Sequence, residues 1–138
     1  MLIHPTVDGL YTLNLSAMAR GLGEQRERPD YQALGFEERL GLLVDLELQE
    51  RENRRLQRSL KAAKLRTNAV VEDIDFRRPR GLDRGQILNL AESLWVANHH
   101  NVLIVGATGL GKSFLACALA HAAIRHGYSA LYLRCLLY

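Results

Sequence analysis

Hydrophobic residues in the first half of the chain recur every three or four positions, which is the period of an α-helix that buries one face. A first series predicts a helix from about Thr6 to the glycines Gly21 and Gly23. Its members are Val7, Tyr11, Leu15, Met18 and Leu22. A second series predicts a long helix from Phe36 to about Leu65, either continuous or with a break near Glu50. Its members are Phe36, Leu40, Leu43, Leu46 (or Leu42), Leu56, Leu60 and Ala63.

Capping residues and a linker delimit the helices. Gly35 can serve as the N-cap of the second helix. The segment Val70 to Pro79 is predicted to be an extended linker, because a helix cannot continue past a proline. Asp83 then predicts the N-cap of a third helix, with Gln86 in the capping-box position three residues later. This third helix is expected to end near Asn98.

The hydrophobic period changes in the last third of the chain. Val102–Val105 is a continuous apolar, β-branched run, which predicts a strand buried on both faces. A glycine-rich stretch follows, then a predicted helix Phe114–His126 that Gly127 ends, and a second short strand, Ala130–Leu133. Together they predict a βαβ unit. We therefore expect an α/β fold in which an N-terminal helical region precedes the first βαβ unit of a parallel sheet, left incomplete. The expected domains are 1–68 (helical), 69–98 (linker and lead-in helix) and 99–138 (partial P-loop domain).

Composition places the chain among globular proteins. Of its 138 residues, 48% are hydrophobic and 24% charged, which argues against disorder. No apolar run approaches the roughly 18 residues that span a bilayer, and Met1–Pro5 lacks the basic start of a secretory signal. The two cysteines, Cys117 and Cys135, are expected to be reduced thiols. These features predict a cytoplasmic protein with no membrane partner.

One segment carries a specific chemistry. It matches the pattern G-x-x-x-x-G-K-[ST] of a phosphate-binding loop (P-loop, Walker A) between a predicted strand and a predicted helix. The predicted nucleotide-binding residues are Gly106, Ala107, Thr108, Gly109, Leu110, Gly111, Lys112 and Ser113. Glycines let backbone amides converge on phosphates, and Lys112 would reach the β- and γ-phosphates. The Ser113 hydroxyl would join the Mg²⁺ shell, so ATP and Mg²⁺ are the expected cofactors.

The acidic residue that a P-loop hydrolase needs has no counterpart after the loop. The 25 residues that follow Ser113 contain neither Asp nor Glu. We therefore predict no catalytic residue and little or no hydrolysis. Two short strands also cannot make a stable sheet alone, which predicts that the chain is the front part of a longer ATPase.

Many short segments in order make the chain resemble the IstB family of transposition helper ATPases, which are AAA+ proteins related to the DnaC helicase loaders. The segments are Phe36–Leu40, Glu52–Leu56, Leu60–Leu65, Pro79–Asp83, Asn101–Ile104, Gly106–Ser113, Leu115–Leu119 and Tyr132–Arg134. The resemblance covers about residues 4 to 134. It implies a helical N-terminal domain joined to an AAA+ module that binds ATP, oligomerises on DNA and delivers target DNA to a transposase.

The same resemblance assigns two segments and marks a departure. By position, the P-loop residues match the family's Walker A loop, and Pro79–Asp83 matches the linker that runs by the nucleotide base. The family's Walker B strand, sensors and arginine finger have no match here, which predicts a C-terminally truncated form. Homo-oligomerisation, a property of the intact family, is then in doubt. A transposase or a full-length homologue is the protein partner that the resemblance implies.

A basic face on the second helix is a candidate DNA contact. Residues 51–66 hold seven basic side chains and one acidic one, Glu52. The residues predicted to touch phosphates are Arg51, Arg54, Arg55, Arg58 and Lys61. The alternative is a solvated helix face.

Three functions stay open at this point. The chain is an ATP-binding accessory protein of DNA transposition, or a DnaC-like helicase-loader relative, or a non-enzymatic helical module that binds DNA or a homologue with an inert P-loop. Nucleotide binding separates the first two from the third.

Overall fold

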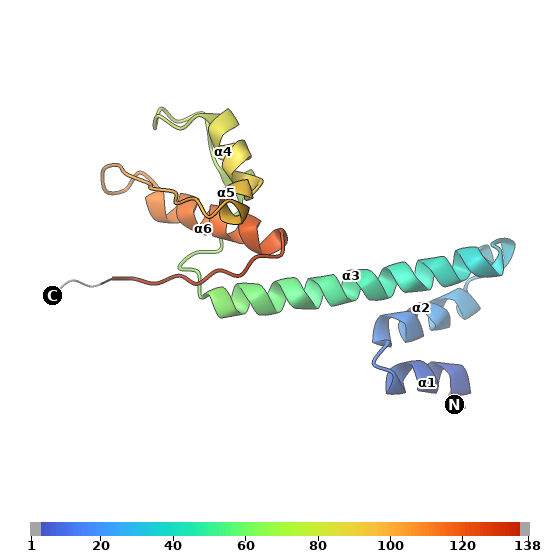
Figure 1. Ribbon diagram of the computed structural model, residues 1–138. Helices are drawn as coiled ribbons and strands as arrows, with labels where there is room; N and C mark the ends of the chain where they lie inside the picture. The colour runs from blue at the N-terminus through green and yellow to red at the C-terminus, as the bar shows by residue number, and fades with distance from the viewer. Residues whose placement is uncertain (1–3, 136–138) are drawn as a thin grey trace. The chain divides into compact units, whose positions relative to one another are not determined.

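A computed structural model describes residues 4–135 of the chain. Its elements in chain order are α1 (Pro5–Thr12), α2 (Ser16–Glu27), the 3-10 helix η1 (Pro29–Ala33), α3 (Phe36–Ala63), the 3-10 helix η2 (Val71–Asp73), α4 (Arg84–Ala91), α5 (Leu94–Ala97) and α6 (Lys112–Arg125), as Figure 1 shows. They form two compact units, Met1–Arg55 and Leu56–Tyr138. The domain boundaries at 68 and 98 stay a prediction. None of the helices described is long and apolar enough to cross a membrane.

The predicted α/β fold is wrong, because residues 4–135 contain no β-strand and no sheet. A strand persists only when a neighbouring strand takes up its backbone donors and acceptors. Neither predicted strand has such a neighbour in this part of the chain. Within residues 4–135, the one backbone bond that joins either of them to another element runs from Tyr132 N to Ala63 O at the end of α3, at 2.8 Å.

Burial in the two apolar segments also differs from the prediction. Leu103 and Val105 are 88% and 90% exposed, whereas Ile104 between them packs against the core. Around Tyr132, which also packs on the core, Leu131 and Leu133 are exposed. This alternation is the period of an extended chain that is covered on one face. Val102–Val105 is therefore not buried on both faces.

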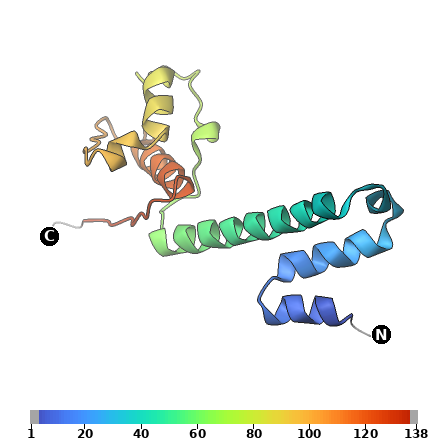
Figure 2. The same cartoon turned by 45° about the vertical axis from the view of Figure 1, so that its right-hand side comes forward.

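The first unit begins with two helices where the sequence predicts one. Asn14 lies between them with a φ of 59°, a left-handed conformation that asparagine tolerates better than most residues. The amide of Leu15 bonds the carbonyl of Leu10 at 2.8 Å, which closes α1. The second helix then runs past Gly21 and Gly23 to Glu27, so the predicted end at the glycines is also wrong. In Figure 2, α1, α2 and the first part of α3 lie side by side.

The helix α3 is continuous over 28 residues, as the apolar series predicts. Its packing against α2 is close at Gly21. A Cβ on Gly21 would lie 2.7 Å from Leu46 Cδ1 and 2.8 Å from Leu43 Cδ2. Of the predicted stripe between Phe36 and Leu46, only Leu43 is buried; Phe36 is 71% exposed. The apolar series therefore gave the helix correctly but not the extent of its buried face.

A carboxylate of α3 caps the start of α2. Glu47 is only 4% exposed, and its Oε2 accepts hydrogen bonds from Ala17 N at 3.0 Å and Met18 N at 3.2 Å. The N-cap position itself is Leu15, which supplies no side-chain acceptor. The free amides of a helix start need such a partner, and a negative charge there also suits the helix dipole. Glu47 thus fixes α2 on α3.

The second unit is built around α6. Cys117, Leu119 and Ala122 of this helix pack with Ala69 and Ile87 in one hydrophobic core. Small side chains along α6 allow the neighbouring segments to approach it closely.

Two capping predictions in this unit are confirmed, and one helix end is corrected. Asp83 accepts from Gly85 N at 3.2 Å and Gln86 N at 3.3 Å at the start of α4. Gly127 follows α6 with a φ of 95°. The predicted third helix, however, breaks at Ser93, whose φ is 62°, so that α5 is a separate short helix.

Candidate functional site

The glycine-rich loop leads directly into α6, and two of its glycines adopt left-handed backbone conformations. Gly109 has a φ of 83° and Gly111 a φ of 92°. L side chains rarely occupy such values, so the sequence requires glycine at both positions. Gly111 is also the N-cap of α6. The loop therefore turns sharply and delivers the chain into the helix.

Lys112 folds back over this loop. Its ammonium Nζ donates hydrogen bonds to the carbonyls of Gly106 and Ala107, both at 2.7 Å. The side chain thus connects the last and first parts of the loop and holds a positive charge against its backbone. The neighbouring Ser113, in the first turn of α6, is exposed.

The start of α6 has the features of an anion site. Gly111 offers no side-chain acceptor to the first amides of the helix, and the first turn holds no acidic residue. Unpaired amides and the helix dipole attract negative charge, and the Lys112 ammonium adds to it. Chemically, this arrangement can bind phosphate groups.

An arginine of the linker reaches the same loop. Arg80 Nη1 donates to Leu110 O at 3.3 Å, and it would lie 3.2 Å from a Cβ on Gly111. A cavity of about 370 Å³ adjoins this contact. It is lined by Asp73, Ile74, Asp75, Arg78, Arg80, Leu82, Leu110, Gly111, Phe114 and Leu115. Arg80 belongs to the Pro79–Asp83 segment, which the family resemblance assigned to the linker by the nucleotide base, and in the structure its guanidinium contacts the loop.

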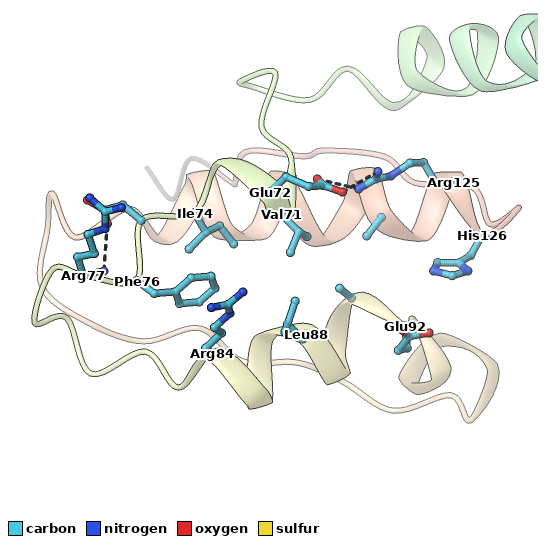
Figure 3. Close-up of a pocket in the computed structure, with 13 residues that line it drawn as sticks. Val71, Glu72, Ile74, Phe76, Arg77, Arg84, Leu88, Glu92, Arg125 and His126 are labelled. Carbon is cyan, nitrogen blue, oxygen red and sulfur yellow. Dashed lines mark hydrogen bonds and ion pairs between the residues drawn. The ribbon is translucent and has the colours of Figure 1, made fainter.

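A cavity larger than this one lies elsewhere in the second unit. It has a volume of about 1010 Å³ and is lined by residues of η2, the linker, α4 and α6, as Figure 3 shows. The Arg84 guanidinium lies over the Phe76 ring at 5.9 Å from its centroid. No residue of the loop 106–113 lines this cavity. The loop chemistry therefore belongs with the smaller cavity.

An ion pair on the rim of the large cavity ties η2 to α6. Arg125 donates to both carboxylate oxygens of Glu72, at 2.9 and 3.1 Å. These hydrogen bonds lower the pKa of Glu72. Burial lowers the pKa of nearby His121, and the Arg125 charge lowers it further. No sequence pattern predicts this pair, because Glu72 and Arg125 are far apart along the chain.

Three of the five predicted DNA-contacting residues are engaged in ion pairs. Arg51 lies 3.4 Å from Glu47, and Arg54 lies 3.3 Å from Glu50. Arg55 pairs with Glu52, which raises the pKa of the arginine and lowers that of the glutamate. Two of these acids precede residue 51, so the count of charges over 51–66 overstates the free positive charge.

The other two predicted DNA-contacting residues, Arg58 and Lys61, have different surroundings. Arg58 and Lys61 are exposed and form no ion pair within residues 4–135. They lie beyond the acidic part of α3. Of the predicted basic face, these are the side chains left available to an external anion.

The chain is similar to a described family and to several known proteins. The family described as "IstB-like ATP binding protein" matches residues 9–136. The protein named "Insertion sequence IS1162 putative ATP-binding protein", from Pseudomonas fluorescens, is 50% identical over 97% of this chain and 58% of its own length. An insertion sequence ATP-binding protein of Sinorhizobium fredii is 45% identical over 97% of this chain and 55% of its own length. The protein named "Insertion sequence IS21-like putative ATP-binding protein", from Bacteroides fragilis, is 33% identical over 86% of this chain and 59% of its own length.

The chain thus spans little more than half the length of the curated relatives it matches. The matched region includes the glycine loop, the lysine that folds over it and the arginine that contacts it. On the extent of this match, the chain belongs to the family of IstB-like ATP-binding proteins.

Proposed function

We propose that the loop 106–113 binds the phosphates of ATP. The observation that carries the proposal is the position of Lys112, whose ammonium is held 2.7 Å from two loop carbonyls at the start of a helix with no acid in its first turn. The names of the relatives, which are ATP-binding proteins of insertion sequences, support the choice of nucleotide.

In this proposal the loop residues act together on the phosphate groups. The ammonium of Lys112 exchanges its two carbonyl acceptors for phosphate oxygens, which are stronger acceptors because they are charged. The amides after Gly109 and Gly111 converge on the same oxygens, and the dipole of α6 favours their charge. Binding therefore reorganises one side chain more than it reorganises the backbone.

The proposed site can hold Mg²⁺ although the protein would supply few ligands to the ion. Mg²⁺ in nucleotide sites keeps several waters and is held mainly by the phosphates themselves. Ser113 is exposed in the first turn of α6, and its hydroxyl is the ligand that the loop would provide. When bound, the ion neutralises part of the phosphate charge.

The cavity beside Arg80 is the proposed place of the base and sugar. It adjoins Gly111 at the end of the loop, and its walls include the Phe114 ring and the Leu82 side chain. Arg80 already contacts the loop there, so that one cation serves both the loop backbone and the nucleotide. The proposal thus gives the linker before α4 a role in holding ATP.

A thermal melt of the full chain with and without Mg-ATP tests the proposal. A ligand that binds only the folded state stabilises it by about 2.7 kcal/mol at a hundredfold excess over Kd. We expect Mg-ATP to raise the melting temperature of the natural chain and to leave that of Lys112→Ala unchanged. ADP should stabilise the protein and AMP much less, because the loop recognises phosphates beyond the first.

Lys61→Ala is the control variant, since it also removes one lysine ammonium, but from the exposed surface of α3. It should retain the full shift. A natural chain that shows no shift with Mg-ATP, or a Lys112→Ala chain that shifts as much as Lys61→Ala, would refute nucleotide binding at the loop.

For the wider role, we propose an ATP-binding accessory protein of DNA transposition that acts with a transposase. The insertion-sequence names of its relatives support this role over helicase loading. Because the 25 residues after Ser113 hold no carboxylate, we expect this chain to bind ATP with little or no hydrolysis. A phosphate-release assay that found steady turnover, lost in Lys112→Ala, would contradict this.

The proposed contact with DNA is on the second half of α3. Arg58 and Lys61 are exposed, without an ion pair in the part of the chain that the structure describes, and on the same helix as the paired Arg51, Arg54 and Arg55. An arginine already neutralised by a glutamate must give up that partner to reach a phosphate. We therefore expect the unpaired cations to contribute most of the affinity, with no preference for base sequence.

A further inference from the structure

The cavity of about 1010 Å³ in the second unit has a regular row of side chains along the wall that α4 provides. Figure 3 shows Arg84 at one end of the cavity, Glu92 at the other and Leu88 between them. These residues are four positions apart, and Glu92 continues the helical backbone with a φ of −65° and a ψ of −13°. Helix positions four apart are offset by only about 40° and about 6 Å. We refer to Arg84, Leu88 and Glu92, a cation, an apolar side chain and an anion, as the α4 row.

The two charges of the α4 row are not used within the part of the chain that the structure describes. Both residues are exposed, and neither forms an ion pair within residues 4–135. The Phe76 ring lies 5.9 Å from the Arg84 guanidinium and holds it at the cavity. At the other end, Arg125 is already bound by Glu72, so it leaves the charge of Glu92 uncompensated.

The order of the two charges is unfavourable for α4 itself. The helix dipole favours an acid at the start of a helix and a base at its end. Arg84 is the first residue of α4, and Glu92 directly follows the last one, so both charges are reversed. The stability of the helix therefore does not account for them. They remain available to a ligand that lies along the cavity.

We propose that this cavity binds an extended peptide segment of another protein, in which an acidic, an apolar and a basic residue occupy alternate positions. Arg84 pairs with the acid, Leu88 contacts the apolar side chain and Glu92 pairs with the base. Alternate side chains of an extended chain point to the same side and lie about 6.6 Å apart. That spacing matches the roughly 6 Å between successive members of the α4 row.

The remaining walls and the size of the cavity suit such a segment. Val71 of η2 faces Leu88 across the cavity, and Ala122 of α6 adds a small apolar side chain to the lining. Five extended residues occupy roughly 800 Å³, from a length of about 17 Å and packing distances of about 4.8 and 10 Å. The cavity of about 1010 Å³ can hold this volume.

An extended segment fits the α4 row with less ordering than a helix does. A helix would need nine residues to place an acid and a base about 12 Å apart on one side. A free helix of that length is marginal in water and would have to form during binding. Five extended residues reach both charges, so we assign the extended form to the partner.

Fluorescence anisotropy of short labelled peptides with the full chain tests the proposal. The probe is Glu-Thr-Leu-Thr-Lys, labelled at its amino end and amidated at its carboxyl end, with threonines that favour an extended chain. We expect saturable binding at least about threefold tighter than that of Thr-Glu-Lys-Leu-Thr, which has the same composition but adjacent charges. The titration is made at pH 8 because His126 also lines the cavity and an uncharged imidazole leaves Glu92 free.

Reversing each charge of the α4 row should change the preferred peptide in a defined way. Arg84→Glu should bind Lys-Thr-Leu-Thr-Lys at least about threefold more tightly than the original probe, and Glu92→Lys should instead prefer Glu-Thr-Leu-Thr-Glu. Both substitutions suit the helix dipole, so α4 should remain folded, which far-UV circular dichroism checks. Arg66→Glu is the matched control, because Arg66 is exposed but does not line the cavity, and it should keep the original preference.

Each outcome decides the proposal. A preference that follows the reversed charge at both positions supports it. A natural chain without saturable binding of Glu-Thr-Leu-Thr-Lys overturns it, as does binding that Arg84→Glu and Glu92→Lys alter no more than Arg66→Glu does. Lys112→Ala should bind the peptide as the natural chain does, because the loop 106–113 does not line this cavity. The peptide site and the proposed ATP site can therefore fail independently.

Discussion

Two glycines in the same helix give a matched test of the α2–α3 packing. Gly21 and Gly23 both lie inside α2, and neither has a positive φ. At Gly23 an added Cβ meets nothing within 4 Å. At Gly21 it would lie 2.7 and 2.8 Å from the ends of two leucine side chains of α3. Replacement by alanine therefore raises the helix propensity equally at both sites. It introduces a steric overlap with α3 only at Gly21.

The expected magnitudes follow from these two terms. Alanine in place of glycine inside a helix stabilises it by about 1 kcal/mol, so Gly23→Ala should increase the free energy of unfolding by that amount. At Gly21 the same gain is opposed by overpacking, which costs about 1–3 kcal/mol. Leu46 is 42% exposed and can rotate away, but Leu43 is 6% exposed and cannot. The two variants should therefore differ by about 1–3 kcal/mol.

Urea unfolding followed by far-UV circular dichroism measures this difference, and thermal melts should separate the variants by about 4 °C per kcal/mol. In Gly21→Ala/Leu46→Ala, the double variant should recover part of the loss, because one of the two obstructing side chains is gone. If Gly21→Ala stabilises the protein as much as Gly23→Ala does, the close approach of α2 and α3 is refuted.

Three further predictions concern charge. Glu47→Ala should destabilise the first unit by about 2 kcal/mol in urea unfolding, because it leaves two helix-start amides without their acceptor; a loss under 0.5 kcal/mol would contradict the cap. The lowered pKa of His121 means that the unfolded state takes up more protons as pH falls below about 6.5, so stability is present above that value and is lost below it. Trp95 fluorescence should report this loss between pH 7.5 and 5.5, and His121→Leu should remove its slope. In fluorescence anisotropy with duplex DNA, Arg58→Ala should weaken binding more than Arg55→Ala does, and should reduce the salt slope by about one; equal effects would contradict the role given to unpaired cations.

The sequence was most informative where local patterns decide the structure. The apolar period predicted α3 over nearly its whole length, and Asp83 and Gly127 marked a helix start and a helix end correctly. The motif also located the glycine loop and its lysine, because left-handed glycines and a helix start are local requirements. These features depend on residues within one or two turns of each other.

The sequence was least informative where distant partners decide. Val102–Val105 has the composition of a buried strand, but a strand needs a neighbour, and none lies in residues 4–135. Glu47 and Arg80 act on segments about 30 residues away, so no spacing rule points to them. One feature of the sequence does point to Glu47. It lies one turn after Leu43 on the side of α3 that is buried, and a buried acid requires a polar partner.

The cap on α2 also bears on the order in which the first unit assembles. Glu47 lies 30 positions after the amide of Ala17 that it binds. A helix of 12 residues without a cap of its own is marginal in water, so α2 gains its full length only once α3 has docked. During synthesis the chain must therefore extend past residue 47 before its second helix is secured. Folding of this unit therefore depends on α3 and on the contact between Glu47 and Ala17, which are distant in sequence, although every element in the unit is a helix.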